Sequence, residues 1–231
     1  MSLIQKNRVL VFDTETTGLF PKKNESNAPG PLPSYKEYPY ILQLSFVVFD
    51  VSTNEIRQKY NEYIKIPSHI EIKPFITNLT GITREMCDTK GILIEQALYD
   101  FYLAYMSVDF VIAHNISFDK RMIELEIQRN ASKFGSSIPS IYFLFNETFN
   151  IVYDIMMVCT MNMGKNVCNI MIEGKNGGQW KKPPKLLELH KVLFGTVPDN
   201  LHNSLIDTMV CLRCFIKIKY NVELPESMIL L

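Results

Sequence analysis

Two acidic side chains interrupt an otherwise apolar run near the start of the chain. Residues 9–12 read Val-Leu-Val-Phe, and Asp13 and Glu15 follow them one residue apart. Side chains alternate in direction along a β-strand, so both carboxylates are expected on the same face. Carboxylates this close raise each other's pKa unless a cation lies between them, and hard divalent cations prefer carboxylate oxygens. The alternative is a strand that ends in a polar turn at residues 16–18, and this stretch alone does not decide between the two.

The composition is that of an ordinary globular protein. Apolar residues make up 47% of the chain and charged residues 21%. The 231 residues are enough to bury a substantial core, and we expect a single domain over 1–231. Lys and Arg together number 24, as do Asp and Glu. This balance argues against a tight nonspecific nucleic-acid binder but is compatible with a local basic groove.

The cysteines and the apolar segments indicate an intracellular protein. Five cysteines is an odd number, which fits a reducing compartment, most simply the cytoplasm, better than a disulfide framework. Cys211 and Cys214 form a C-x-x-C pair inside an apolar helical pattern, which favours buried thiols over a zinc or redox site. The sequence shows no signal-peptide pattern and no 18-residue apolar stretch, so we expect neither secretion nor a membrane span.

The order of the expected elements indicates an α/β domain with a mixed sheet. The first strand is followed by strands at 40–50 and 55–66, which predict a three-strand antiparallel meander. Helices are expected at 92–106, 117–129, 185–194 and 203–220, and strands at 110–113 and 151–153. Gly195 and Asn203 are expected as helix caps. Two inserted surface loops are expected, near 20–39 and 162–184, the second as a loop or small flap.

Two further acids lie where a strand gives way to a helix or where a helix begins. Asp119 follows the strand expected at 110–113, and ligand sites in open α/β sheets lie at the carboxyl ends of strands. Asp207 lies early in the last helix. For both acids the alternative is a first-turn residue favoured by the helix dipole. His202, taken alone, is most simply a loop or capping histidine.

Together these motifs resemble the DEDDh exonuclease superfamily, which includes the proofreading subunit of bacterial replicative polymerases. The resemblance spans residues 8–219, in matching order and spacing. The matching residues are Asp13-Thr14-Glu15 in the first motif, His114-Asn115 with Phe118-Asp119 in the second, and His202 with Asp207 in the third. Two positions depart from the family pattern: Ser204 replaces the usual alanine of the third motif, and Thr80 stands where histidine is usual before Gly81-Ile82-Thr83.

The resemblance implies a ribonuclease-H-like fold, with a mixed central sheet flanked by helices, and a metal-dependent 3′→5′ exonuclease. It implies that Asp13, Glu15, Asp119 and Asp207 bind two Mg²⁺ or Mn²⁺ ions, and that His202 acts as general base. The substrate would be a nucleic acid with a free 3′ end, single-stranded DNA being favoured over RNA, and the products nucleoside 5′-monophosphates. A polymerase or a replication or repair protein would be the expected partner. Two alternatives stay open: an enzyme that trims RNA ends, and a nuclease-like module that binds without cutting.

The same resemblance implies a set of residues that hold the terminal nucleotide. They are Thr14, Thr16, Thr17, Leu19, Leu79, Ile82, His114, Asn115 and Phe118. Trp180 stands beside Lys181, Lys182 and, a little further along, Lys185. This group is either a stacking and basic contact to the strand or a solvated loop, and the sequence leaves both open.

Overall fold

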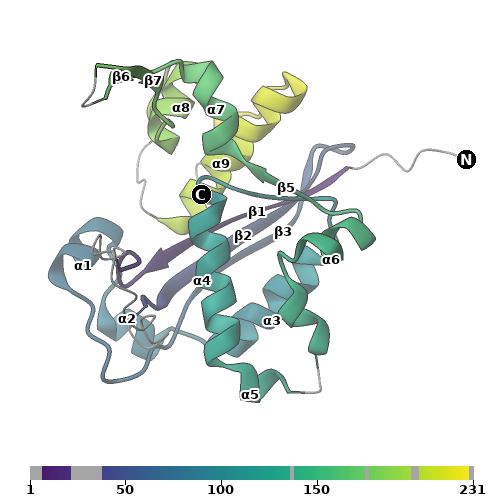
Figure 1. Ribbon diagram of the computed structural model, residues 1–231. Helices are drawn as coiled ribbons and strands as arrows, with labels where there is room; N and C mark the ends of the chain where they lie inside the picture. Colours follow the sequence, from purple (N-terminus) through teal and green to yellow (C-terminus); the bar gives the residue numbers. More distant parts are fainter. Residues whose placement is uncertain (1–6, 22–37, 136–137, 175–176, 199–202, 229–231) are drawn as a thin grey trace, which may run out of the picture.

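A five-stranded mixed sheet forms the centre of the computed structural model, which describes residues 7–21, 38–135, 138–174, 177–198 and 203–228. The strands lie in the order β3-β2-β1-β4-β5, with β1 in the middle (Figure 1). Their bounds are β1 (Arg8–Thr16), β2 (Ile41–Asp50), β3 (Glu55–Tyr63), β4 (Phe110–Ala113) and β5 (Met156–Cys159). β1, β2 and β3 pair antiparallel, whereas β4 pairs parallel with both β1 and β5. The predicted meander and mixed sheet are confirmed.

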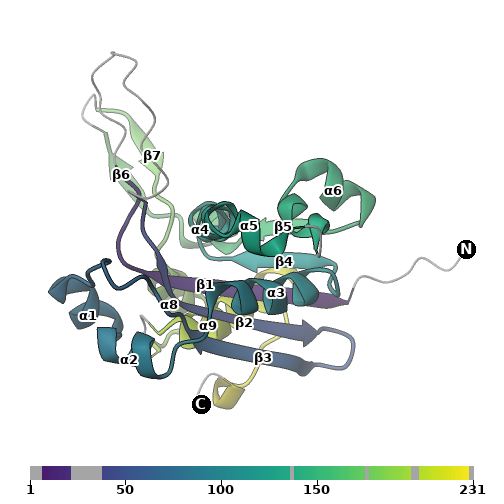
Figure 2. The ribbon, with the colours of Figure 1, turned by 90° about the horizontal axis from the view of Figure 1, so that it is seen from below.

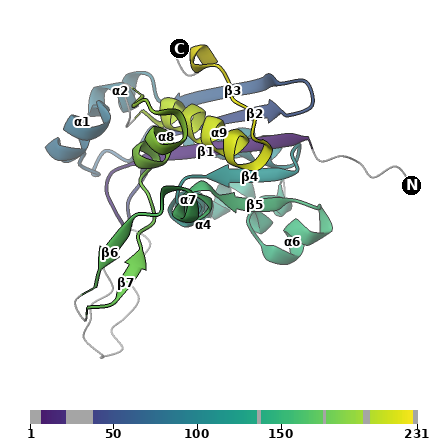
Figure 3. The ribbon, with the colours of Figure 1, turned by 90° about the horizontal axis from the view of Figure 1, so that it is seen from above.

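Helices cover both faces of the sheet, and the alternation along β1 decides which face each side chain joins. Leu10 and Phe12 pack in a core cluster with α3 (Ile94–Tyr105) and α4 (Ile116–Arg129), and Figure 2 shows α3 across this face. Val9 and Val11 pack against α8 (Leu186–Phe194) and α9 (Ser204–Tyr220), which lie across the other face in Figure 3. Period-2 alternation therefore sends Asp13 and Glu15 toward the face that α9 covers.

The remaining elements lie around this core. They are α1 (Pro74–Thr80), α2 (Arg84–Thr89), α5 (Ala131–Phe134), α6 (Glu147–Val152), α7 (Thr160–Cys168), the hairpin strands β6 (Met171–Glu173) and β7 (Gln179–Lys181), and 3₁₀ turns at Pro139–Phe143 and Glu226–Met228. Among the described helices, none has the length and apolar character needed to cross a bilayer. All five cysteines are free, and Cys211 and Cys214 are buried in α9, which confirms the expectation of buried thiols.

One expectation from the sequence was wrong in detail. The strand expected at 151–153 is the end of α6, and the true strand, β5, begins at Met156. Ile151 and Val152 are β-branched and so favoured a strand, but each is 72% exposed at the end of a helix that Asn146 caps through the Phe149 N–H. Tertiary position overrode local propensity there.

The segment 162–184, expected as a loop or small flap, is more ordered than a loop. It holds most of α7 and the β6–β7 hairpin. Gly164 obscured the helix because glycine disfavours a helix interior, but a Cβ at this position would lie 2.9 Å from the Pro184 ring. The same Cβ would lie 3.0 Å from the Leu189 side chain of α8, so the glycine allows α7 to pack closely on α8. In the other expected insertion, 20–39, residues 22–37 lie outside the described part of the chain.

Candidate active site

The structure brings three of the predicted acids together at the carboxyl end of β1. Asp13 and Glu15 come from β1, and Asp207 comes from the first turn of α9. Each of these three side chains offers a carboxylate oxygen, and the three oxygens lie within 4.8 Å of one another. α9 reaches the strand because it packs along β1 and β2 through the apolar residues of its inner face, among them Leu205 and Met209.

Asp119, the fourth acid, lies beside this group rather than inside it. It is 3% exposed, in the first turn of α4. Its Oδ1 accepts hydrogen bonds from the Thr14 backbone N–H at 3.0 Å and from the Thr14 hydroxyl at 2.7 Å. Thr14 lies between the two acids of β1 but points to the opposite face of the strand, so the same strand that carries two acids also orients the third.

Burial, and after it mutual repulsion, raises the pKa values of this group. Burial, followed by Asp207 and then Asp119, raises the pKa of Glu15 to about 8. Burial first, then the neighbouring carboxylates, holds the pKa of Asp13 well above its usual range. Burial also raises the pKa of Asp119 to about 7, while its hydrogen bonds from Thr14 oppose that rise. Four carboxyl groups arranged in this way require a compensating positive charge to be ionised together at neutral pH.

The start of α9 is fixed by hydrogen bonds that orient Asp207. The Asn203 side chain accepts from the Leu205 and Ile206 N–H groups, as expected of the N-cap. The Ser204 hydroxyl, which replaces the usual alanine, is fully buried and hydrogen-bonds to the Ser45 hydroxyl on β2. His202, the predicted general base, immediately precedes this cap and lies outside the described residues.

The residues after the acids form a turn that returns the chain to β2. The Thr16 hydroxyl donates to the Gly18 carbonyl oxygen at 2.7 Å, and Thr17 exchanges two hydrogen bonds of 2.9 Å with the Tyr40 backbone. Leu19 follows this turn and is 83% exposed. The hydrogen bonds of Thr16 and Thr17 are therefore those of turn-forming residues, as the alternative interpretation of the sequence expected. The same turn can also present Leu19 to a ligand.

The two predicted apolar contacts near α1 occupy different environments. Leu79, near the end of α1, is 49% exposed. Ile82 is 1% exposed and lies in a small core cluster with Leu42, Ile66 and Ile76. Leu79 can therefore contact a ligand directly, whereas Ile82 supports the segment from below.

The residues of the second motif, His114-Asn115 and Phe118, have different structural roles. His114 is held at both ring nitrogens, by the Thr160 hydroxyl at Nδ1 and the Pro184 carbonyl oxygen at Nε2, each at 3.0 Å. Burial lowers the pKa of His114, which favours a neutral ring that donates from Nε2 to the carbonyl. Asn115 caps α4 with a left-handed backbone (φ 68°), and the Phe118 ring packs 4.9 Å from that of Phe20. Sequence reasoning missed the structural task of His114, because its partners are distant in the chain.

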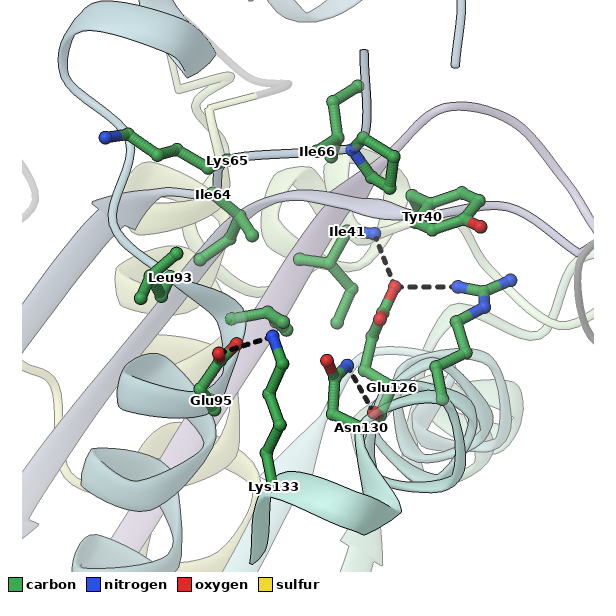
Figure 4. A pocket seen from close by; sticks show the side chains of 13 residues that line it. Tyr40, Ile41, Ile64, Lys65, Ile66, Leu93, Glu95, Glu126, Asn130 and Lys133 are labelled. Atoms are coloured by element: carbon green, nitrogen blue, oxygen red, sulfur yellow. Dashed lines mark hydrogen bonds and ion pairs between the residues drawn. The ribbon is translucent and has the colours of Figure 1, made fainter. Parts of the chain in front are cut away.

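A cavity of about 420 Å³ lies away from the acids (Figure 4). It is bounded by the entry to β2, the segment after β3, and the ends of α3 and α4. Glu126 in its wall is seven residues after Asp119, or about 10 Å along the helix. Glu126 accepts from Arg129 at 2.7 Å and from the Ile41 N–H at 3.3 Å, so the wall is held by a buried ion pair. The cavity is not part of the carboxylate site.

Comparison with known families identifies the chain. The family model described as exonuclease (RNase_T) matches residues 10–215. The chain belongs to the exonuclease family. This agrees with the resemblance seen in the sequence motifs.

Curated relatives match over part of the exonuclease segment. The 3′-5′ exonuclease DinG of Bacillus subtilis is 27% identical over 126 residues, which are 54% of this chain and 11% of DinG. The PolC-type DNA polymerase III of Thermotoga petrophila is 32% identical over 120 residues, which are 52% of this chain and 7% of the polymerase. The chain therefore spans about a tenth or less of the length of these relatives.

Solved exonuclease structures share the fold. Escherichia coli exonuclease I in complex with a dT13 oligonucleotide superposes with a TM-score of 0.60 at 16% identity, over 92% of this chain and 41% of that one. A 3′-exonuclease described as recognising the histone mRNA stem-loop superposes with a TM-score of 0.60 at 16% identity, over 95% and 66%. The ribonuclease-H-like fold implied by the sequence is thereby confirmed.

The acidic group fits the divalent metal ions that the exonuclease family implies. Its donors are all carboxylate oxygens, which Mg²⁺ and Mn²⁺ prefer over nitrogen or sulfur ligands. Burial and the neighbouring carboxylates raise the pKa values of Asp13 and Glu15, so their ionised forms call for positive charge. A bound cation would supply the missing charge.

Proposed function

We propose that this chain is a metal-dependent 3′→5′ exonuclease that removes nucleoside 5′-monophosphates from single-stranded nucleic acid, with DNA favoured. The observation that carries the proposal is the group of three carboxylate oxygens within 4.8 Å, in a chain of the exonuclease family. The direction of cleavage is supported by a relative named as a 3′-5′ exonuclease. DNA is favoured because two of the curated relatives are DNA polymerases and a solved structure with this fold holds dT13.

Asp13, Glu15, Asp119 and Asp207 would hold two divalent cations between them. When bound, such ions neutralise phosphate charge, stabilise the leaving oxygen and lower the pKa of a coordinated water. Thr14 keeps Asp119 in one orientation through its two hydrogen bonds. His202 is the proposed proton acceptor, since an unperturbed histidine with a pKa of about 6.5 can accept a proton near neutral pH.

The terminal nucleotide would lie over the turn that follows β1. Leu19 and Leu79 present exposed apolar side chains suited to the faces of a base. Thr16 and Thr17 keep the turn rigid through hydrogen bonds to its backbone and to Tyr40. Asn115 and Phe118 are proposed for the opposite side, at the start of α4. His114 and Ile82 contribute by supporting these residues, because each is engaged within the protein.

RNA is the second candidate substrate, and one observation favours it. A structure with this fold is described as a 3′-exonuclease that recognises an mRNA stem-loop. Since the PolC-type relatives carry the matching segment inside a polymerase, a replication or repair protein is the proposed partner class.

The decisive experiment is digestion of matched 5′-labelled DNA and RNA oligonucleotides with Mg²⁺ or Mn²⁺. We expect a ladder that shortens from the 3′ end, faster for DNA, and no products with a chelator. Asp207→Ala should reduce the rate at least about 100-fold, since each metal supplies several kcal/mol of stabilisation. Glu55→Gln is the matched control, because Glu55 is an exposed acid on β3 that pairs with Arg57. Undiminished activity of Asp207→Ala, or oligonucleotide binding without cleavage in either metal, would overturn the proposal.

A further inference from the structure

The β6–β7 hairpin projects from the body of the protein (Figures 2 and 3). Ile172 is half-buried, and the other five residues of the two strands are exposed. The cross-strand pairs are Met171 with Lys181, Ile172 with Trp180, and Glu173 with Gln179. A two-stranded hairpin alone is only marginally stable in water. Because this hairpin stands away from the core, burial of its side chains contributes little to its stability. Its side chains are available to a ligand.

Trp180 is a large aromatic side chain whose exposure on this hairpin does not serve the stability of the fold. It is the one tryptophan in the sequence, and 51% of it is exposed. A Cβ added at Gly174 would lie 3.7 Å from the indole Nε1, so the ring edge lies against the hairpin backbone. Burial of a large aromatic side chain is strongly favourable because it removes much apolar surface from water. About half of the Trp180 surface is still exposed, so a partner could bury it.

Lysines accompany the tryptophan. The chain as a whole has no net charge, yet residues 160–187 hold five lysines and one glutamate. The Lys181 ammonium donates to the Asn166 side-chain oxygen at 3.0 Å, and within the described part of the chain this neutral group is its partner. Lys182 differs, because it pairs with Glu188 at 2.7 Å and so holds the base of the hairpin. Exposed aromatic and cationic groups together fit a single-stranded nucleic acid, which offers base faces and phosphates.

The base of the hairpin is joined to the elements that carry the acidic site. Pro184, just after β7, accepts a hydrogen bond from the His114 Nε2, and His114 lies between β4 and the α4 cap. Thr160, which starts α7, bonds to the other nitrogen of His114 and lies 3.3 Å from the Cys211 sulfur, one turn of α9 beyond Asp207. Pro184 and Thr160, on either side of the hairpin, are thus linked to His114, just before α4, and Thr160 also to Cys211 in α9; these two helices hold Asp119 and Asp207 in their first turns.

We propose that the β6–β7 hairpin holds the single strand on the 5′ side of the nucleotide being removed, with Trp180 stacked on a base and Lys181 near a phosphate. This inference rests on the proposed function, because it takes the carboxylate group as the place where the 3′ end lies. It adds a specificity determinant outside that group: the hairpin distinguishes oligonucleotides from mononucleotides and does not contact the reacting bond.

Fluorescence of Trp180 tests the proposal without any need for cleavage. The protein is titrated in chelator with dT12, U12 and dTMP, and the emission of its single tryptophan is followed. We expect saturable quenching by one or both 12-mers and none by dTMP. Trp180→Ala should weaken 12-mer binding, measured with a labelled strand, by about 5- to 100-fold, and Trp180→Phe by much less. The matched control is Tyr153→Ala, which removes a similarly exposed aromatic (52%) at the end of α6.

The charge is tested through salt dependence. Lys181→Ala should reduce the slope of log affinity against log salt by about one, whereas Lys59→Ala on β3 should leave it unchanged. In turnover with metal, Trp180→Ala should raise KM for dT12 and leave kcat for the dinucleotide pTpT unchanged. Active enzyme with no quenching, and a Trp180→Ala variant with wild-type affinity and KM, would overturn the hairpin proposal alone. Quenching and weakened Trp180→Ala binding in a protein that never cleaves would support strand binding at the hairpin but overturn both the exonuclease assignment and the placement of that strand relative to a 3′ end.

Discussion

The Ser204 hydroxyl in the first turn of α9 hydrogen-bonds to the Ser45 hydroxyl on β2, and both residues are fully buried. Ser45 also donates to the Asn61 side-chain oxygen at 2.7 Å, so the contact belongs to a polar chain across β2 and β3. The serine that departs from the family's usual alanine therefore has a partner on the adjacent strand. It fixes the helix turn that presents Asp207.

Ser45→Ala should destabilise the protein more than Ser204→Ala. Loss of Ser45 leaves the buried Ser204 hydroxyl without this partner, at a cost of about 1–3 kcal/mol, whereas Ser45 retains Asn61 when Ser204 is replaced. The double variant should recover part of the loss, because removing both polar groups can be nearly neutral. Urea denaturation measures each change, with exposed Ser68→Ala as control. Equal costs for both single variants would contradict this account.

Stability without metal should fall as pH rises from 6.5 to 8.5. The pKa of Glu15 is raised from 4.5 to about 8, and that of Asp13 is also raised, so the folded protein binds more protons here than the unfolded chain. Stability then decreases with pH. His114, whose pKa is lowered, has the opposite effect, but only below about 6.5, where an unfolded histidine gains its proton.

The measurement is the thermal midpoint in chelator and in Mn²⁺ across this range. Mn²⁺ should raise the midpoint more at pH 8 than at pH 6.5, because it supplies charge to carboxylates that are then ionised. Asp207→Asn should flatten the chelator profile, since Asp207 raises the pKa of both neighbours. A profile that rises with pH in chelator would exclude the proposed repulsion.

Thr14→Val should weaken metal binding while leaving the fold intact. The substitution keeps the shape of the side chain but removes the hydroxyl that donates to Asp119 at 2.7 Å, and the backbone N–H at 3.0 Å remains. Loss of a group that orients a metal ligand typically costs 10- to 100-fold in affinity or activity, so we expect about 10-fold here. The Mn²⁺ dependence of the cleavage rate measures it. Thr14→Ser should restore most of the loss; failure to do so would mean that side-chain packing, and not the hydroxyl, matters.

The sequence was most informative where periodicity and chemistry coincide. Strand alternation put Asp13 and Glu15 on one face, and the helix caps at Gly195 and Asn203 were expected from residue type alone. It was least informative where a residue acts through distant partners. The hydrogen bonds from His114 to Thr160 and Pro184 span 46 and 70 residues, and no local pattern encodes them.

The same limit applies to the secondary structure and to the fourth acid. Ile151 and Val152 favoured a strand locally, yet the chain uses them to end a helix at the surface. The family resemblance implied that Asp119 joins the other acids, but not that Thr14, between two of them, would be its hydrogen-bond donor. That relationship depends on the parallel pairing of β1 and β4, which sets where α4 begins.

The buried pair of Glu126 and Arg129 gives a prediction about stability alone. Their side chains are 4% and 7% exposed, and Arg129 also donates to the Pro39 and Tyr38 carbonyl oxygens at 2.8 and 2.7 Å. Arg129→Met would leave the Glu126 carboxylate buried without that cation, which costs about 3–5 kcal/mol. Burial already raises the pKa of Glu126, and the Arg129 guanidinium opposes that rise.

Adding Glu126→Gln to Arg129→Met should recover much of this loss. Glutamine can still accept a hydrogen bond from the Ile41 N–H but carries no charge, so the cost of keeping an unpaired charge buried disappears. The exposed pair of Arg57 and Glu55 is the control, and Glu55→Gln, which leaves the contact of Arg57 with Asp50 in place, should cost less than about 1 kcal/mol. Because the pair lies about 10 Å along α4 from Asp119, cleavage by the folded double variant should stay near the wild-type rate. If the double variant is folded and as stable as expected but cleaves much more slowly than the wild type, the cavity wall would instead lie within reach of the substrate.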